Sequence, residues 1–220
     1  MVLAGCGVYD GTEITEATAA LVHLSAAGCD VSCFAPNKDQ AHVINHTKGE
    51  EMSPARNVMV EAARIARGKI EPLSELAVDG FDALIIPGGF GAAKNLCNHA
   101  MVAQGDPAKF EVDAHVSAAV VGFHTAAKPI GMCCIVPVIA ASLLKCKVTV
   151  GQEEGERWPY GGTVGAITAY GGKHVATDID GVCVDTTHKV VTTCAYMYEG
   201  APHEIHASVG LMVAETLKLV

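Results

Sequence analysis

The sequence predicts one α/β domain over residues 1–220, with a mostly parallel sheet flanked by helices. Two observations carry this prediction. Short apolar runs alternate with amphipathic stretches along the chain, which is typical of strands joined by crossover helices. Half of the residues are apolar and only 18% are charged, so the chain can fill a large core and disorder is excluded. No internal repeat or linker divides it.

The first apolar run ends at Ala4 and leads into the glycine-rich segment 5–11. A helix is expected from about Thr12 to Ala27, because its apolar residues recur at helical spacing. Gly28 ends this helix as a left-handed C-terminal cap would. The next strand is expected over residues 31–35.

Residues 37–52 are polar and without a clear period, which predicts a loop. Ser53-Pro54 then favours a helix to about Arg67, with serine as the N-cap and proline at the first helical position. Residues 83–86 form a buried strand that runs into Pro87-Gly88-Gly89-Phe90-Gly91. Asp106-Pro107 begins another predicted helix, which ends near Ala127.

Residues 129–133 are the next buried strand, and Cys134 and a helix through Leu144 follow it at once. Residues 147–150 and two segments near Val182 and Val190 complete the predicted sheet. A closing helix carries one apolar stripe: Ile205, Val209, Met212, Val213 and Leu217.

The charge of the chain excludes one class of partner. The formal net charge is −9 with only 15 basic residues, and no run of them, so no nucleic-acid partner is expected. No apolar run is long enough to span a membrane, and no signal peptide is present, so no membrane partner is expected. Because the chain starts almost directly on the apolar run that ends at Ala4, we expect further residues upstream, such as a targeting segment.

The nine cysteines are interpreted as free thiols in a reducing compartment. Their number is odd, and Cys33, Cys133 and Cys183 lie in apolar, strand-like segments. No C-x-x-C pair occurs, and the spacing of Cys29 and Cys33 does not suit a zinc ribbon. We therefore expect neither a structural metal nor a cofactor.

Cys134 is the candidate nucleophile, because it lies between a buried strand and a helix with Pro137 in its first turn. Unpaired N–H groups and the positive end of the helix dipole would favour its thiolate and could hold an oxyanion. The alternative is one more buried thiol in a cysteine-rich core. Side chains alternate along a strand, so Cys133 should face away from the site and pack into the core.

Two glycine-rich turns follow strands. The pattern Gly5-x-Gly7-x-x-x-Gly11 is not interpreted as a dinucleotide site, because Asp10, Glu13 and Glu16 crowd the place of a pyrophosphate. The turn 87–91 lacks the Gly-Lys-Ser/Thr ending of a phosphate loop. It suits close approach of backbone to a ligand, with the Gly89 N–H as an oxyanion donor, or else a plain strand-to-helix turn.

Several motifs together resemble one family: Gly5-Cys6-Gly7-Val8-Tyr9-Asp10-Gly11, Phe34-Ala35-Pro36, Asn45-His46, Pro87-Gly88-Gly89-Phe90-Gly91-Ala92-Ala93-Lys94-Asn95-Leu96, Lys128-Pro129-Ile130-Gly131 and Val190-Val191-Thr192-Thr193. They resemble the ElbB-like (enhancing lycopene biosynthesis) proteins and their mitochondrial amidotransferase-like homologue in animals. These belong to the class I glutamine amidotransferase-like superfamily, in the branch that holds PfpI-type proteases and a parkinsonism-associated glyoxalase/deglycase. The resemblance implies a three-layer, flavodoxin-like sandwich, a homodimer, and Cys134 at a nucleophile elbow.

The resemblance also implies a carboxyl group beside this thiol, and the matching residue is Glu16. Burial and the neighbouring charge would raise its pKa and make it a protonated hydrogen-bond donor. The alternative is a solvated acid in a first helical turn, which suits Glu13 better. The N–H groups of Gly89 and Ile135 are the candidate oxyanion donors. Candidate substrate-binding residues are His46, Asn95 and Gln152.

The chain departs from the family pattern where a histidine would follow the elbow helix, because Gln152 stands in that region. Without a histidine base, a Cys–His–acid hydrolase is in doubt. His46, His203 and His206 are weighed as substitutes. His124 is more simply interpreted as a favourable contact at a helix C-terminus.

Three functions remain open from the sequence. The first is a cysteine-dependent enzyme on small reactive carbonyls, of glyoxalase or deglycase type, with Cys134 as nucleophile and Glu16 moving protons. The second is a catalytically silent binding or redox-sensing module, and the third an amidotransferase-type subunit that needs an external partner. An animal source would imply mitochondria and a bacterial source the cytoplasm.

Overall fold

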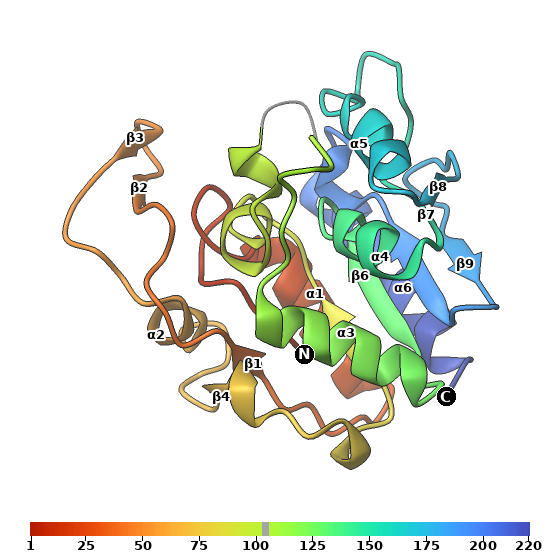
Figure 1. Ribbon diagram of the computed structural model, residues 1–220, viewed down its shortest axis with the longest axis horizontal. Helices are drawn as coiled ribbons and strands as arrows, with labels where there is room; N and C mark the ends of the chain where they lie inside the picture. The colour runs from red at the N-terminus through yellow and green to blue at the C-terminus, as the bar shows by residue number, and fades with distance from the viewer. Residues whose placement is uncertain (103–105) are drawn as a thin grey trace.

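The computed structural model describes residues 1–102 and 106–220, and its central element is a sheet in the order β5–β6–β10–β9 (Figure 1). These strands are β5 (Leu84–Ile86), β6 (Ile130–Cys133), β10 (Val190–Thr193) and β9 (Cys183–Asp185). β5, β6 and β10 are parallel, and β9 is antiparallel to β10. The sequence therefore predicted the mostly parallel sheet correctly.

The first residues of the chain extend this sheet on its other side. β1 (Phe34–Ala35) pairs in parallel with β4 (Glu71–Pro72). The segment at Val2 and Leu3 lies between β1 and β5: the Val2 N–H donates to the Ile85 carbonyl at 3.0 Å, and the Leu3 N–H to the Phe34 carbonyl at 2.8 Å. Two half-sheets are thus joined through the start of the chain.

Helices cover both faces of the sheet, which gives three layers (Figure 1). α1 (Ile14–Ala26) and α6 (Pro202–Leu217) pack against each other on one face, and α3 (Ala114–Thr125) and α4 (Pro137–Leu144) lie on the other. α5 (Thr163–Ala169) packs on α4 and on the small parallel pair of β7 (Lys147–Val148) and β8 (Lys173–His174). The flavodoxin-like sandwich expected from the resemblance is confirmed.

The remaining elements are short. They are the helix α2 (Val58–Ala62), the hairpin of β2 (Ile44–Asn45) and β3 (Glu50–Glu51), and single turns at Leu73–Glu75, Val78–Gly80, Ala92–Leu96, His99–Met101 and Ala195–Met197. The hairpin extends away from the body of the molecule in Figure 1. It interrupts the segment 37–52, which the sequence predicted to be a loop. Ile44 is its one strand residue that is apolar, so the pattern gave no strand signal.

Two helices begin later than predicted, because a capping residue further along the chain is the N-cap in each of them. The helix predicted over 53–67 has Asn57 as its N-cap, with Asn57 Oδ1 accepting the Val60 N–H at 3.1 Å. The helix predicted from Asp106 starts at Ala114, where Asp113 accepts the His115 N–H at 3.0 Å. Asp106 instead accepts the Ala108 N–H within a turn.

The strand predicted over 31–35 is confined to Phe34–Ala35, and that over 147–150 to Lys147–Val148. β1 lies between β4 and the segment at Val2. β7 pairs with β8 in a small sheet of its own, so it does not join the central sheet as predicted.

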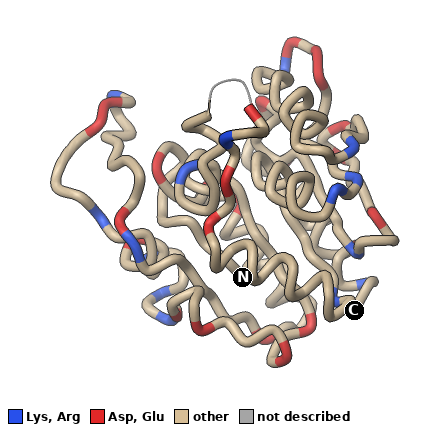
Figure 2. Tube along the Cα trace, viewed as in Figure 1, with Lys and Arg blue, Asp and Glu red and all other residues tan. Residues whose placement is uncertain are grey.

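The core and the surface agree with the composition. Large side chains that are fully buried include Phe123, Leu3, Ile86, Ile130 and Met132. Lysines and arginines are scattered over loops and helix ends and do not gather on one face in Figure 2.

None of the helices in the described residues has the length and apolar character to span a membrane. All nine cysteines are free thiols, as the sequence predicted.

Candidate active site

Cys134 occupies a sharp turn between β6 and α4. Its φ is +59°, in the left-handed region that non-glycine residues rarely adopt, and its N–H donates to the Thr193 carbonyl at 3.1 Å. Backbone strain of this kind costs about 1–3 kcal/mol and is concentrated at functional sites. The side chain is 7% exposed. The predicted elbow geometry is therefore present.

Glu16 lies in the first turn of α1 and is fully buried, so it is not the solvated acid considered as its alternative. Its Oε2 accepts the Gly88 N–H at 2.9 Å and its Oε1 accepts the Tyr196 N–H at 3.1 Å. The carboxyl group thus joins α1 to the turn after β5 and to the segment after β10. Glu13 accepts the Glu16 N–H at 2.7 Å and is the N-cap of the helix.

Burial raises the pKa of Glu16 to about 7, and the charge of Glu13 adds to this shift, while the N–H groups of Tyr196 and Gly88 oppose it. This carboxyl group can therefore gain or lose a proton near neutral pH. The raised pKa agrees with the expectation from the sequence.

The pKa of Cys134 is raised well above its usual value, first by burial and then by the charge of Glu16. N–H groups of Gly89 and Ile135 that face the sulfur oppose the shift without reversing it. The expectation that the helix N-terminus lowers this pKa is wrong in direction, because desolvation of the thiolate outweighs the helix dipole. Cys134 is thus a thiol that needs a base, and the Glu16 carboxylate lies beside it.

Gly88 and Gly89 hold the turn 87–91 against this pair. A Cβ at position 88 would lie 2.4 Å from the Cys134 Cβ, and one at position 89 would lie 2.5 Å from the Glu13 nitrogen. Gly89 also has φ +103°. The backbone of this turn therefore lies close to Cys134 and to the start of α1, and its predicted close approach to a ligand stays a prediction.

Cys133 is fully buried, as predicted, but it does not face away from Glu16. Its sulfur lies 3.6 Å from Glu16 Oε2, because the left-handed turn at Cys134 breaks the alternation of a regular strand. Burial and the charge of Glu16 raise the pKa of Cys133 well above its usual value.

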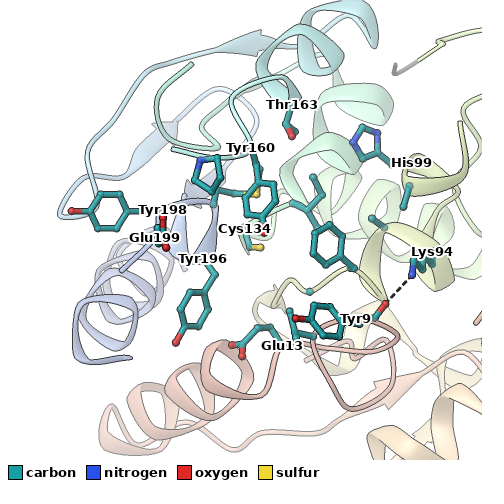
Figure 3. Close-up of a pocket in the computed structure, with 18 of the residues that line it drawn as sticks. Tyr9, Glu13, Lys94, His99, Cys134, Tyr160, Thr163, Tyr196, Tyr198 and Glu199 are labelled. Carbon is teal, nitrogen blue, oxygen red and sulfur yellow. Dashed lines mark hydrogen bonds between the residues drawn. The ribbon is translucent and has the colours of Figure 1, made fainter. Parts of the chain in front are cut away.

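Cys134 opens onto a cavity of about 810 Å³ (Figure 3). Much of its wall is aromatic: Tyr9, Phe90, Tyr160, Tyr196 and Tyr198. Polar lining residues include Glu13, Lys94, His99, Thr163 and Glu199. In Figure 3 the ring of Tyr160 lies in front of Cys134.

Lys94, His99 and Tyr160 were not found as site residues by sequence reasoning. Lys94 follows the glycine-rich turn 87–91 within the same quoted motif, which was the available signal. His99 Nδ1 lies 2.9 Å from the Tyr170 hydroxyl, and burial lowers the His99 pKa, which keeps the ring neutral.

None of the three candidate substrate-binding residues lines this cavity. His46 Nε2 accepts the Tyr9 N–H at 3.2 Å, so His46 holds a residue of the cavity wall without lining the cavity itself. The Asn95 side chain is buried and bonds the Ala4 and Asp10 carbonyls and the Ala41 N–H. Gln152 lies in the irregular segment after β7 and is half-buried.

The other histidines weighed from the sequence are also placed elsewhere. His206 Nδ1 lies 3.4 Å from His23 Nε2, between α6 and α1. His203 is exposed near the start of α6. His124 Nδ1 lies 3.3 Å from the His188 carbonyl. Within residues 1–102 and 106–220, no group of three His, Cys, Asp or Glu side chains is arranged to hold a metal ion.

Comparison with known proteins gives relatives along the whole chain. No family model matches. The human "Glutamine amidotransferase-like class 1 domain-containing protein 3, mitochondrial" and the rat "ES1 protein homolog, mitochondrial" are each 52% identical over 223 residues, which cover 100% of this chain and 82% of each relative.

Solved structures also resemble this chain over its whole length. An isoprenoid biosynthesis protein with an amidotransferase-like domain from Ehrlichia chaffeensis is 33% identical, with a TM-score of 0.88 over 100% of this chain and 98% of that one. A DJ-1 superfamily protein from Salmonella typhimurium is 19% identical, with a TM-score of 0.57 over 99% of this chain and 88% of that one. This second likeness shows the fold alone.

Proposed function

The chain belongs to the ElbB-like family of glutamine amidotransferase-like class 1 proteins, which includes the mitochondrial ES1 proteins, and we propose that it is a cysteine-dependent enzyme acting on reactive carbonyl compounds. The proposed reaction is of glyoxalase or deglycase type, with Cys134 as nucleophile. One observation carries the proposal: a fully buried carboxyl group with a pKa of about 7 lies against a thiol that opens onto a large cavity.

The chemistry starts with a proton transfer. The Glu16 carboxylate takes the proton of the Cys134 thiol while the sulfur bonds to the aldehyde carbon of an α-oxoaldehyde, which gives a hemithioacetal. The N–H groups of Gly89 and Ile135, which face the sulfur, are donors for the oxygen as it gains charge.

Glu16 then completes the reaction as a proton carrier. It returns the first proton to the oxygen, which becomes the hydroxyl group of the hemithioacetal. Glu16 afterwards moves a proton from the aldehyde carbon to the neighbouring carbonyl carbon, and the hydroxyl proton passes to the oxygen of that neighbouring carbonyl. The product at this stage is a thioester of a hydroxy acid. Water cleaves the thioester, which releases the acid and restores the thiol. No external oxidant or reductant is required.

Consumption of methylglyoxal by the parent and by Cys134→Ser tests this proposal. We expect the variant to lose activity by about 100-fold or more, since the nucleophile is removed. Cys29→Ser is the matched control, because Cys29 is a half-buried thiol that does not line the cavity. A Cys134→Ser protein as fast as the parent would overturn the proposal.

A catalytically silent binding or redox-sensing module is the second candidate, and it is favoured by the lack of a histidine base among the described residues that line the cavity with Cys134. His99 is the one histidine among the described cavity-lining residues, and its Nδ1 is engaged with Tyr170. A raised pKa of Cys134 works against redox sensing, because the thiolate is the form that peroxide oxidises. Oxidation of Cys134 by dilute peroxide without turnover of any aldehyde would support this module.

We also propose that the protein forms a homodimer through the outer face of α1 and α6. This face includes the exposed apolar residues Ile14, Val22 and Leu211 and the small exposed residues Thr18 and Ala207. Two copies that each carry a net charge of −9 repel one another, so a face whose contacting side chains are uncharged is the favoured place for a contact. A contact made by these uncharged side chains meets that condition.

The prediction that an animal member of this family is mitochondrial is confirmed by the human and rat relatives, whose names describe mitochondrial proteins. For this chain we propose the same location if its source is an animal.

A further inference from the structure

The cavity beside Cys134 is much larger than a three-carbon aldehyde requires. Its volume is about 810 Å³, and a cavity of roughly 300–1,000 Å³ suits a drug-sized ligand. A second cavity of about 230 Å³ adjoins it, and the two share Tyr9, Phe90 and Lys94 in their walls. The two cavities thus adjoin at Lys94, and Ile44 and Gly49 from the hairpin segment line the second one.

Aromatic side chains form the part of the wall near the thiol. Phe90 and Tyr160 meet edge to face, with ring centroids 5.8 Å apart and an interplanar angle of 80°. Such a pair presents flat apolar surface to a ligand, and an aromatic body gains contact area there. A three-carbon aldehyde would leave most of this surface in contact with water.

Lys94 is the cation at the junction of the two cavities. Its Nζ donates to the Tyr9 carbonyl at 2.9 Å, and Figure 3 shows this bond at one side of the cavity. None of the ion pairs formed within the described part of the chain includes Lys94. Burial lowers the pKa of Lys94, while Asp10 and Glu51 oppose the shift from a distance. A half-buried ammonium without a carboxylate partner is a binding point for an anion.

Glu13 and Glu199 are the acids among the described lining residues of the larger cavity, and neither forms an ion pair with Lys94. In Figure 3, Glu199 and Lys94 appear on opposite sides of Cys134. Glu13 is engaged as the cap of α1 through its bond to the Glu16 N–H. Lys94 is thus the one lysine or arginine among the described lining residues, and a bound anion is attracted to it and repelled by Glu199 on the other side of Cys134.

We propose that the carbonyl substrate is an elongated compound with an aromatic body and a carboxylate at its far end, and that Lys94 determines this specificity by binding the carboxylate. This inference rests on the proposed function, because it places the reacting carbonyl at Cys134. Phe90 and Tyr160 pack against the body between the two ends.

Three aldehydes separate size from charge: methylglyoxal is small and neutral, phenylglyoxal is aromatic and neutral, and 4-carboxyphenylglyoxal is aromatic and anionic. We expect kcat/KM to rise in this order in the parent. Lys94→Met should lower kcat/KM for 4-carboxyphenylglyoxal about 10-fold more than for phenylglyoxal, mainly through KM. Lys94→Arg should restore the preference, and Lys69→Met, at an exposed position, is the control.

The outcomes distinguish this inference from the proposed function. Cys134-dependent turnover that is fastest with methylglyoxal, or equal effects of Lys94→Met on both aromatic aldehydes, would overturn the inference and leave the proposed function standing. If no aldehyde is consumed, the proposed function fails. Calorimetric binding of mandelate and 4-carboxymandelate then decides the specificity of Lys94: tighter binding of the dianion that Lys94→Met abolishes supports it, and equal binding overturns it.

Discussion

Glu16 Oε2 accepts the Gly88 N–H at 2.9 Å, in a space that a side chain at position 88 would have to enter. A Cβ on Gly88 would lie 2.8 Å from this oxygen and 2.9 Å from the Cys134 sulfur. The bond and the absence of a side chain together keep the acid and the thiol in contact.

Gly88→Ala should therefore separate the pair. We expect kcat/KM to fall about 100-fold, because a displacement of about 1 Å can have that effect, and stability to fall by about 1–3 kcal/mol from overpacking. Gly165→Ala in α5 is the matched control, since no heavy atom lies within 4 Å of its Cβ position. It should gain about 0.5–1 kcal/mol by replacing a helical glycine. A Gly88→Ala enzyme with parental kinetics would contradict the geometry.

Alkylation of Cys134 by iodoacetamide tests the direction of its pKa. Because burial and the charge of Glu16 raise this pKa, the reaction in the parent should accelerate only at alkaline pH. Glu16→Gln removes the charge and should shift the alkylation profile to lower pH, whereas Glu75→Gln, at an exposed position, should leave it in place. Peptide mass spectrometry follows the modified site. A thiolate already formed below pH 7 in the parent would refute this result.

The pH dependence of turnover should report Glu16 as a base. The carboxylate form is active and its pKa is about 7, so kcat/KM should rise with pH through this value and level off above it. Glu16→Gln should lower the plateau and remove the rise near pH 7. Steady-state rates from pH 5.5 to 8.5 provide the measurement, and an unchanged profile in the variant would assign the titration to another group.

The free energy of unfolding should also depend on the protonation of Glu16, but it should fall as pH rises, whereas the activity rises. The pKa of Glu16 is raised from 4.5 to about 7 in the folded state, so the folded protein binds more protons between these values and loses stability as pH rises across them. The loss attributable to Glu16 is about 3 kcal/mol.

Urea unfolding of the parent and of Glu16→Gln at pH 5 and pH 8 isolates this contribution. The variant is less stable overall, because glutamine keeps only one of the two accepting oxygens, and the N–H group of either Gly88 or Tyr196 then loses its acceptor. The decisive quantity is the change with pH, which should be smaller in the variant. Equal changes in the two proteins would count against a proton on Glu16.

The proposed dimer face can be tested by adding charge. Val22→Glu or Leu211→Glu places an acid on the outer face of α1 or α6 and should convert a dimer into a monomer in sedimentation equilibrium. Val60→Glu on α2, at a position that is 59% exposed, is the control. A parent that sediments as a monomer at all concentrations would remove the dimer proposal.

The fold was largely predictable because strands and helices leave local signals. The apolar run 129–133 and Pro137 fix β6 and the start of α4, and with them the position of Cys134. The starts of α2 and α3 were predicted too early, because each segment holds two residues able to cap a helix: Ser53 and Asn57 in one, and Asp106 and Asp113 in the other. Which of them does so depends on tertiary contacts, and a local pattern does not contain these.

The site was predictable only in part. Glu16 lies beside Cys134 as the family resemblance implied, and the N–H groups of Gly89 and Ile135 face the sulfur as the two strand-to-helix turns predicted. The aromatic wall was not foreseen, because Tyr9, Phe90 and Tyr160 come from separate loops that share no spacing. The pKa of Cys134 was predicted in the wrong direction, since a sequence shows a helix N-terminus but not the depth of burial beside it.

The segment at Val2 and Leu3 has a consequence for the order of assembly. Its amides pair with residues 34 and 85, so the two half-sheets can be joined only after a long stretch of chain has been synthesised. Contacts of such sequence separation slow folding. Once formed, they lie in the interior of the sheet, and the amide hydrogens of Val2 and Leu3 should exchange with solvent as slowly as those of the core strands.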